Sequence, residues 1–382
     1  MKFIHLLATL VFYAGCQEDE GSKATTHLSD HYGVASVVSN GLDLTITSFN
    51  AGFLHGIVPL AKERLPQVIH AVNALNTDVV CMQEIWLESD LAAIKAGLSA
   101  NYPYMSEIAP AQHLSGTQPV CTASQLTDIL GDAASRAASD YLKCAIENRG
   151  AAQCGLNFGA IDSSNRLCAE ALFTQIADYG IKNLASIRER LLGEDPGRYS
   201  FAGSSGLLFL SKKPFTQTMD LDFAPDKSAV SRRAALFAKI DQVDRELVVG
   251  CTHLASNTSL PYPGEHGAWE GEALIQADAM IEKAGAFSGG LDTVLTGDFN
   301  CSFANESLYV LSEMEAVCQK FIDAGYVDAT SELECTYCNS NSITEETAVG
   351  GNGWLLDRIF VSQGLTSSSA QRVLTATFET EI

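Results

Sequence analysis

Four apolar runs in this sequence each end in a polar side chain of a kind that binds phosphate or a metal ion. LTITSF ends at Asn50, VVCMQ at Glu84, LVVGCT at His253 and TVLTG at Asp298. Ligand sites in sheet proteins form where strand ends open into loops, so these side chains are expected to meet. Period-two alternation also places Asp298 and Asn300 on one face. The repeated pattern predicts a single site built from several strands.

These side chains suit phosphoester hydrolysis. A phosphodiester already carries negative charge, so its hydrolysis needs a hard cation, neutral or cationic donors, and a base for water. Glu84 and Asn50 offer oxygen ligands that Mg²⁺ accepts, with water completing the coordination. His253 and Asn300 can donate to the phosphate, and Asp298 can orient the attacking water or its base. Alone, Asn50 is also typical of a strand-end turn and His253 of a core histidine, so the prediction depends on the set.

The elements that must position these residues alternate between strands and helices. Residues 34–38 and 42–49 are β-rich and flank Asn40-Gly41, which predicts an antiparallel hairpin. Residues 60–75 carry apolar side chains at helical spacing, and a buried strand is expected over 78–84. After residue 206 strand-like runs return, with one helix between them: GLLFLS, AALFAKI, LVVGCTH, TVLTGDFN and WLLDRIFVS.

Residues 105–200 differ in character from the rest of the chain. They are rich in alanine, carry helical apolar stripes and contain four cysteines, so we expect an inserted helical subdomain closed by disulfides: Cys121, Cys144, Cys154 and Cys168. Helices near 122–147 and 165–193 would set Cys144 opposite Cys168. Cys121 would then pair with Cys154, which is one of three connectivities.

The chain has eleven cysteines, which in an exported protein favour disulfides. A second group of disulfide candidates lies near the C-terminus: Cys301, Cys318, Cys335 and Cys338. The spacing of the last two could suggest zinc, but no second ligand pair accompanies them. Cys81 and Cys251 lie inside apolar strand-like runs and are predicted to be buried free thiols.

The first sixteen residues, MKFIHLLATLVFYAGC, have the features of an export signal. Their apolar run is too short to span a bilayer. The ending Ala14-Gly15-Cys16 resembles a bacterial lipoprotein signal, which predicts lipidation of Cys16 and a cell-envelope lipoprotein. Ordinary signal cleavage, with secretion and a spare cysteine, is the alternative. Residues 17–26 are polar and are expected to form a flexible tether.

Composition and charge restrict the choice of function. The chain has 382 residues, of which 46% are hydrophobic, so it can form one large α/β domain with an insertion. The formal net charge of −22 repels a phosphate backbone at long range, which disfavours tight non-specific binding of nucleic acid. A nuclease whose metal ion attracts the substrate remains compatible with this charge.

Five segments resemble, in order, the motifs of the endonuclease/exonuclease/phosphatase superfamily. They are SFNAG at 48–52, MQEIW at 82–86, CTHLAS at 251–256, GDFNC at 297–301 and LLDRIFVS at 355–362. The resemblance covers most of residues 42–382 apart from the helical insertion. It implies an α/β (α+β) fold: a four-layer α/β/β/α sandwich of two mixed β-sheets flanked by helices, with an inserted helical subdomain.

One motif of this superfamily stands at an unusual place. The family ends with a Ser-Asp-His motif that leads into its last strand, whereas this chain reaches Ile382 without one. The segment LSDHYGV at residues 28–34 supplies it instead. In the family the last strand lies antiparallel beside the first, so a hairpin through Asn40-Gly41 would preserve the packing. The resemblance therefore implies a circularly permuted catalytic domain over residues 27–382.

The resemblance also implies the metal ligands. Glu84 matches the principal ligand, Asn50 lies nearby, and Asp30 reaches the same ion or a second one. The implied cofactor is one or two Mg²⁺ ions, with Mn²⁺ or Ca²⁺ as alternatives.

Roles in proton transfer and phosphate binding follow in the same way. His31 matches the histidine that takes a proton from water, and Asp357 matches the carboxylate that fixes its tautomer. We therefore expect His31 within hydrogen-bond reach of Asp357. His253 and Asn300 match phosphate-binding positions, with Asp298 as their partner.

The substrate class follows from two further likenesses. ECTYCNSNSIT followed by GNGWLLDRIFVS is similar to neutral sphingomyelinases, and LSDHYGV is close to their ending. A phosphodiester substrate, with a phospholipid favoured, agrees with export and with a membrane lipid anchor; no obligate protein partner is inferred. Secreted deoxyribonucleases of the superfamily share the GDFNC motif and a later cysteine, so an endonuclease is an alternative, as is a small-phosphoester phosphatase. From a different class, a non-catalytic surface lipoprotein or binding module is the further alternative.

Overall fold

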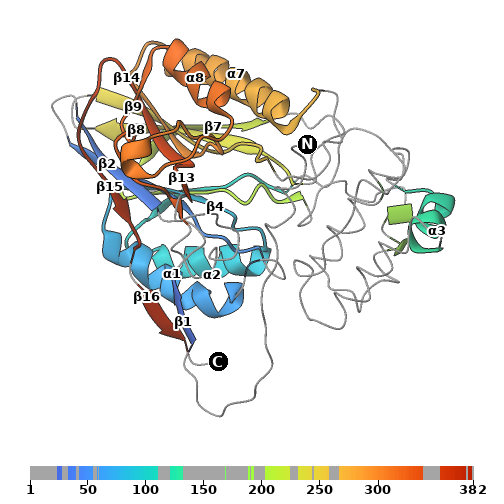
Figure 1. The fold of residues 1–382 in the computed structure, drawn as a ribbon. Coiled ribbons are helices and arrows are strands. Elements are labelled where there is room, and N and C mark those ends of the chain that lie inside the picture. Colours follow the sequence, from blue (N-terminus) through green and yellow to red (C-terminus); the bar gives the residue numbers. More distant parts are fainter. Residues whose placement is uncertain are drawn as a thin grey trace.

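Two mixed six-stranded sheets form the centre of the protein in a computed structural model, with helices on their outer faces (Figure 1). The structure describes residues 24–27, 33–39, 43–54, 58, 60–110, 121–131, 168, 188–189, 191–192, 203–223, 231–242, 245–257, 266–338, 353–375 and 377–380. The predicted four-layer α/β/β/α arrangement is confirmed.

The first sheet has the strand order β15-β2-β3-β4-β6-β5. Its strands are β15 (Thr366–Val373), β2 (Gly33–Ser39), β3 (Leu44–Asn50), β4 (Val79–Gln83), β6 (Leu208–Ser211) and β5 (Tyr104–Ser106). The outer face is covered by α1 (Ala61–Leu75) and α2 (Glu88–Leu98). An apolar cluster that includes Phe49, Val72 and Met82 fills the space between this sheet and its helices.

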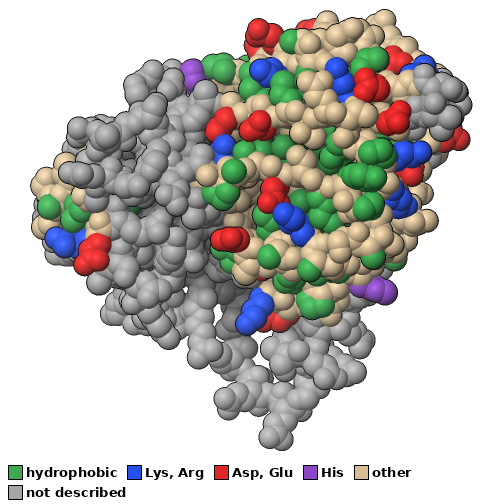
Figure 2. Space-filling model, turned by 180° about the vertical axis from the view of Figure 1, so that it is seen from behind, with side chains coloured by type: hydrophobic (Ala, Val, Ile, Leu, Met, Phe, Trp, Pro, Cys, Tyr) green, Lys and Arg blue, Asp and Glu red, His purple; other side chains and the backbone are tan. Residues whose placement is uncertain are grey.

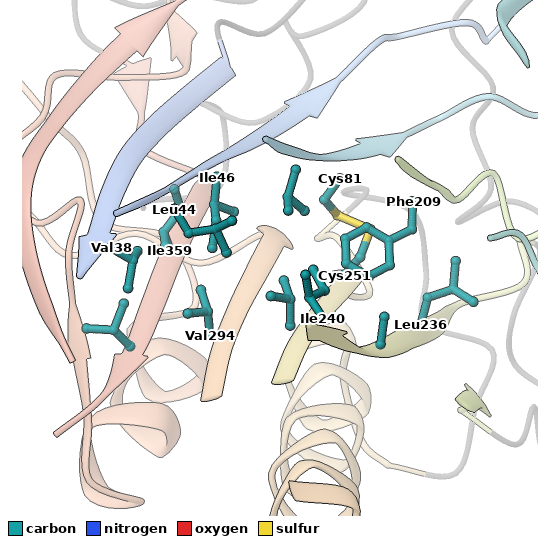
Figure 3. Packing of buried hydrophobic residues seen from close by; sticks show 14 of the residues in the cluster. Val38, Leu44, Ile46, Cys81, Phe209, Leu236, Ile240, Cys251, Val294 and Ile359 are labelled. Carbon is teal, nitrogen blue, oxygen red and sulfur yellow. A yellow bond between two sulfur atoms is a disulfide. The ribbon is translucent and has the colours of Figure 1, made fainter. Parts of the chain in front are cut away.

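The second sheet has the strand order β11-β14-β10-β9-β8-β7. Its strands are β11 (Tyr326–Asp328), β14 (Asp357–Ser362), β10 (Thr293–Asp298), β9 (Arg245–His253), β8 (Ala234–Gln242) and β7 (Phe215–Asp222). The helices α7 (Trp269–Ser288) and α8 (Glu315–Asp323) cover it. The core between the two sheets contains Ile46, Phe209 and Val294 (Figure 3).

Parallel strand pairs fix where the site must open. β3 and β4 are parallel and joined through α1, while β9 and β10 are parallel and joined through α7. A parallel pair needs such a crossover, and both of its strands then end at the same edge of the sheet. The two sheets therefore each present two adjacent strand ends for the site.

The predicted hairpin is confirmed. β2 pairs antiparallel with β3, with Val34 opposite Ser48 and Val38 opposite Leu44. The turn residues Asn40 and Gly41 lie outside the described residues. On its other side β2 pairs with β15, so it is an interior strand of the first sheet. Near the chain ends, β1 (Ala24–His27) pairs with β16 (Thr377–Thr380).

The disulfides correct one prediction and confirm another. Cys81 and Cys251 were expected to be free thiols, but they form a disulfide between β4 and β9. Both side chains are fully buried and point into the space between the sheets, where the two strands face each other. The disulfides Cys301–Cys318 and Cys335–Cys338 agree with the prediction for that group. The second of these leaves no free thiol at this position for a zinc ion.

The predicted pairing in the insertion is wrong. Cys121 bonds to Cys168, which contradicts the expected pairs Cys121–Cys154 and Cys144–Cys168. Cys121 precedes α3 (Ala123–Gly131), and its backbone N–H donates to the carbonyl of Leu191, so it packs against a later segment. Cys144 and Cys154 lie outside the described residues.

The predicted insertion over 105–200 is described only in parts. Residues 105 and 106 belong to β5, and Ile108 packs in the core between the sheets. In Figure 1 α3 lies apart from both sheets. The predicted signal, with Cys16, and the tether lie outside the described residues. Of the helices that the structure describes, none combines the length and apolar character of a membrane span.

A short hairpin stands beside the second sheet. β12 (Tyr337–Cys338) pairs with β13 (Gly353–Trp354), and the 3-10 helix η5 (Glu306–Leu308) lies in the loop that contacts it. Leu311 donates its N–H to the carbonyl of Gly353. Through these contacts the loops after β10 and before β14 are tied together.

Candidate active site

The strand ends singled out by the sequence meet in the structure. Asn50 pairs in register with Gln83 on β4, one residue before Glu84. On the second sheet Asp298 lies opposite His253 on one side and Asp357 on the other.

Asp298 joins the two sheets. Its Oδ2 accepts a hydrogen bond from Asn50 Nδ2 at 2.9 Å, and its Oδ1 accepts one from the backbone N–H of Asn300 at 2.9 Å. Nε2 of His253 lies 3.7 Å from Oδ2. Asp298 and His253 are almost completely buried. One carboxylate therefore sets the relative positions of three predicted site residues.

Glu84 lies one residue beyond β4 in the left-handed region, with φ of 60°. Such a conformation is uncommon outside glycine and is found more often at functional sites. Burial raises the pKa of the Glu84 carboxyl, while the charge of Arg233 and a hydrogen bond with Asn50 act in the opposite direction. The carboxylate is therefore held in a place where a cation would favour its ionised form.

The loop after β3 fixes the Asn50 carboxamide. Asn50 Oδ1 accepts a hydrogen bond from the N–H of Gly52 at 3.0 Å. Arg64 on α1 is buried and donates to the carbonyl oxygens of Ala51, at 3.2 Å, and Gly52, at 2.6 Å. Phe53 donates its N–H to the carbonyl of Glu84. The two residues of the first sheet are thus held through one loop.

Asp357 is fully buried at the start of β14. Its Oδ1 accepts a hydrogen bond from the Ser48 hydroxyl at 3.0 Å, and its backbone N–H donates to Thr336 Oγ1 at 3.1 Å. Burial, and then the charge of Asp298, raise the pKa of the Asp357 carboxyl well above its ordinary value. Among the described residues, Oδ2 has no hydrogen-bond partner. Its predicted partner His31, like Asp30, lies outside the described residues.

The residues of this site fall within a segment that matches a known family. The model of the Endonuclease/Exonuclease/phosphatase family matches residues 47–378. The chain belongs to this family. No curated protein sequence matches it.

Several solved structures are similar in fold. Sphingomyelinase C from Streptomyces griseocarneus is 14% identical over 86% of this chain and 84% of its own, with a TM-score of 0.47. A beta toxin from Staphylococcus aureus is 14% identical over 84% and 86%, with a TM-score of 0.47. An endonuclease/exonuclease/phosphatase from Bacteroides vulgatus is 16% identical over 86% and 87%, with a TM-score of 0.42.

One side chain of the site in this family member, Arg233, was missed in the sequence. Arg233, just before β8, feels the charges of Glu84 and Asp298, and burial lowers its pKa. Its guanidinium carbon lies 5.8 Å from the Trp86 ring centroid, and its Nη1 is buried without a hydrogen-bond partner among the described residues. The only signal was the pair Arg232-Arg233 before an apolar run. Arg232 instead forms an ion pair with Asp222. The sequence does not show which of the two neighbouring arginines faces the site.

Aromatic packing and hydrogen bonding orient the phosphate-binding candidates. The rings of Trp86 and His253 lie 6.2 Å apart. Asn300 Nδ2 donates to the carbonyl of Leu254 at 3.0 Å, and an amide nitrogen has a second hydrogen for a ligand. Asn300 also has a positive φ of 50°, which turns the chain at the end of GDFN.

The residues fit a hard divalent cation. The site gathers three carboxylates, Glu84, Asp298 and Asp357, and the guanidinium of Arg233 lies near Glu84 and Asp298. Within the described part of the chain, no three His, Cys, Asp or Glu side chains form a ready metal-binding group. Mg²⁺ is commonly held by one or two carboxylates, with water and substrate oxygens in the remaining positions. Glu84, with the amide oxygen of Asn50, matches that donor set.

Proposed function

We propose that this family member is an exported, metal-dependent phosphodiesterase in which the first sheet holds the metal and the second sheet holds the phosphate. The observation that carries the proposal is the position of Asp298, which binds Asn50 of the first sheet and Asn300 of the second while facing His253. Asp298 therefore fixes the distance between the proposed metal ligands, Glu84 and Asn50, and the proposed phosphate-binding residues, His253 and Asn300. A phosphate bound to the metal would contact both pairs.

Glu84 and Asn50, together with Asp30, would hold Mg²⁺. When bound, the ion would polarise a phosphoryl oxygen and offset the negative charge of the site. Arg233 supplies a second positive charge beside Glu84. His253 and Asn300 would donate hydrogen bonds to the phosphate from fixed positions, which is the kind of preorganised stabilisation that lowers the barrier.

His31 is proposed as the base that takes a proton from water, oriented by Asp357. Gly33, where β2 begins, approaches Ser48 so closely that an added Cβ would lie 2.8 Å from the Ser48 carbonyl oxygen. The Ser48 hydroxyl in turn contacts Asp357. The two Cα–Cα steps from Gly33 through Tyr32 to His31 span at most about 7 Å, so the proposed arrangement needs no long excursion of the chain for the imidazole to reach Asp357 Oδ2. An imidazole N–H there would satisfy a buried oxygen that is costly to leave without a donor.

This position of His31 also supports a circularly permuted domain. The Ser-Asp-His segment leads directly into β2, and β2 lies antiparallel beside β3. In the proposed arrangement the family's last strand has become an early strand of this chain. The packing of the first sheet is unchanged by that transfer.

Sphingomyelinase-like phospholipid hydrolysis is the proposed reaction. The sequence likeness around residues 334–362 favours it, and the four disulfides among the described residues agree with export to an oxidising compartment. On the face shown in Figure 2, the basic side chains of the described residues lie scattered among acidic ones. A nucleic-acid site would ordinarily gather them into a patch or stripe. A lipid anchor at Cys16 would hold the enzyme at a membrane.

Endonuclease activity is the second candidate, favoured by one observation. Cys301, which closes the GDFNC motif, bonds to Cys318 on α8, the arrangement that resembles secreted deoxyribonucleases. Parallel assays of the mature protein on sphingomyelin, DNA, phosphoinositides and a chromogenic phosphodiester distinguish the substrates. We expect Mg²⁺-dependent hydrolysis of the chromogenic diester and the highest rate on sphingomyelin. If no diester is hydrolysed with any divalent metal, the protein is a binding module and the proposal is wrong.

A further inference from the structure

We propose that the Cys81–Cys251 disulfide is a positioning element of the site, which holds the metal side and the phosphate side at their working distance. This inference rests on the proposed function, because it concerns the spacing between Glu84 and His253. It assigns to these two cysteines a role beyond packing in the core.

The disulfide joins the two sheets directly. Cys81 belongs to β4 of the first sheet and Cys251 to β9 of the second, and neither has exposed surface (Figure 3). Their Cα atoms are 5.4 Å apart. Packed sheets ordinarily lie about 10 Å apart. At this one point the backbones of the two strands are therefore held by a covalent bond at about half that distance.

This crosslink is directly behind the site. Glu84 follows Cys81 by three residues, and His253 follows Cys251 by two. At about 3.3 Å per residue along a strand, both side chains start within about 10 Å of the sulfur atoms. A shift of β4 relative to β9 would reach His253 almost undiminished, since β9 continues without a turn from Cys251 to His253, and it would move Glu84 together with the end of β4.

A second connection runs from the sulfur to Asp357. Gln83 Nε2 donates to Cys81 Sγ at 2.9 Å and to Ser48 Oγ at 3.3 Å. Ser48 then donates to Asp357 Oδ1 at 3.0 Å. The same amide also donates to the Cys81 carbonyl oxygen at 3.2 Å, so without the sulfur its two hydrogens would go to that oxygen and to Ser48. The disulfide is thus connected to Asp357 through Gln83 and Ser48.

The simpler role is stabilisation alone. A crosslink between residues 170 positions apart restricts the unfolded chain, so its removal lowers stability whether or not it positions the site. A positioning role predicts more, namely a loss of turnover at temperatures where the variant is fully folded. It also predicts a measurable change in the distance between the two sheets at the site.

The test compares two disulfide deletions in the full chain. Cys81→Ala/Cys251→Ala is expected to lower kcat on the order of 100-fold, the scale for misplacing reacting groups by about 1 Å. KM should change less than about threefold, because the binding groups themselves remain. Cys121→Ala/Cys168→Ala removes a buried disulfide outside the site and is expected to keep kcat near the wild-type value. If Cys81→Ala/Cys251→Ala does not fold, the variant Cys81→Ala/Cys251→Val is tested in its place, because the valine restores much of the lost side-chain volume.

Trp86 gives a readout that does not need activity. Its ring lies 6.2 Å from that of His253, across the junction of the two sheets, and imidazole quenches indole fluorescence on contact. The other two tryptophans are removed by Trp269→Phe and Trp354→Phe, and His253→Leu, made both with and without the Cys81–Cys251 bond, supplies the lifetime without imidazole quenching and separates it from quenching by the disulfide itself. The Trp86 lifetime should lengthen toward that value when the Cys81–Cys251 bond is absent and stay unchanged in the control.

These readouts separate the two proposals. A folded variant without the Cys81–Cys251 bond that keeps both wild-type kcat and a wild-type Trp86 lifetime would overturn the positioning role. If the wild-type protein hydrolyses no phosphodiester, the proposed function fails, while the Trp86 lifetime still decides whether the bond sets the spacing.

Discussion

The two sheets contribute to one site but hold their residues in different ways. The first sheet presents Asn50 at its last position and Glu84 beyond it, where Glu84 has a left-handed backbone and remains partly exposed. The second sheet keeps His253, Asp298 and Asp357 within its ladder, all nearly or fully buried and adjacent in register. An ion that arrives with its own water shell needs an accessible ligand, which Glu84 supplies although Asn50 is fully buried, whereas donors to a phosphate act best when fixed in advance.

This difference predicts that changes in the first sheet affect metal binding, while changes in the second sheet also affect the fold. The first-sheet residues are positioned by the loop after β3, in which Arg64 donates hydrogen bonds to the backbone carbonyls of Ala51 and Gly52. The second-sheet residues hold one another through Asp298. Four substitutions test the distinction.

The largest effect is expected from Glu84→Gln. The substitution removes the anionic ligand without changing volume, so hydrolysis should fall to background. Since burial raises the pKa of the Glu84 carboxyl, a neutral side chain there should leave the melting temperature unchanged or higher at pH 7. Turnover is measured with a chromogenic diester and stability by calorimetry. Wild-type turnover in this variant would remove Glu84 from the mechanism.

Asp298→Asn should be nearly as damaging and should also weaken the fold. We expect kcat/KM to fall about 1000-fold, the upper scale for losing a preorganised charged group. An amide in place of Oδ2 faces the Asn50 amide, so about 1.5–3 kcal/mol of hydrogen bonding to a charged group is lost. Relief of the repulsion with Asp357 offsets part of that cost. Stability is measured by urea titration and activity by steady-state kinetics. A variant that loses activity but keeps the wild-type free energy of unfolding would contradict the predicted effect on the fold.

His31→Ala should lower turnover on the order of 100-fold, the usual scale for losing a general base. Added imidazole should restore part of the activity, because it can take the proton in place of the missing side chain. A deletion of residues 17–26 serves as the control and should change turnover little, since this segment only tethers the domain. Full activity in the alanine variant would place the base elsewhere and leave the permuted arrangement without its main support.

Asp357→Asn should alter how stability depends on pH. Because the folded-state pKa of Asp357 lies above its ordinary value of 3.8, the folded protein keeps a proton that the unfolded chain loses. Stability of the wild-type protein should therefore fall as pH rises from about 4 toward the raised pKa, by at most about 1.4 kcal/mol per pH unit. The variant should lack this contribution. Melting curves of both proteins are recorded from pH 4 to 7. If the stability of the two proteins changed equally with pH, the argument from the burial of Asp357 would be contradicted.

Local pattern was enough to predict several strand ends and the first hairpin, while the four-layer fold and the choice of Asp357 came from the family resemblance. Apolar runs ending in Asn50, Glu84, His253 and Asp298 marked real strand ends, and the Asn-Gly turn marked the pairing of β2 with β3. These features depend on neighbours within one strand or one turn. The sequence carries them directly, because strand period and turn chemistry are local.

What the sequence did not show depends on contacts between the sheets. Cys81 and Cys251 lie in separate apolar runs, and only the packing of β4 against β9 makes them partners. Arg233 becomes part of the site because β8 begins beside Glu84, while Arg232 turns to Asp222. The bond between Ser48 and Asp357 spans 309 positions of the chain. Such relations have no periodic or motif signal in a single sequence.

The division of labour between the sheets is tested most directly by titrating Mg²⁺ into two variants, Glu84→Gln and His253→Gln, with heat as the readout. Both changes remove a site residue, and both leave an amide in its place. The account predicts that Glu84→Gln no longer binds Mg²⁺ while His253→Gln binds it as the wild-type protein does. Wild-type binding by Glu84→Gln, or an equal loss in both variants, would contradict the assignment of the metal to the first sheet.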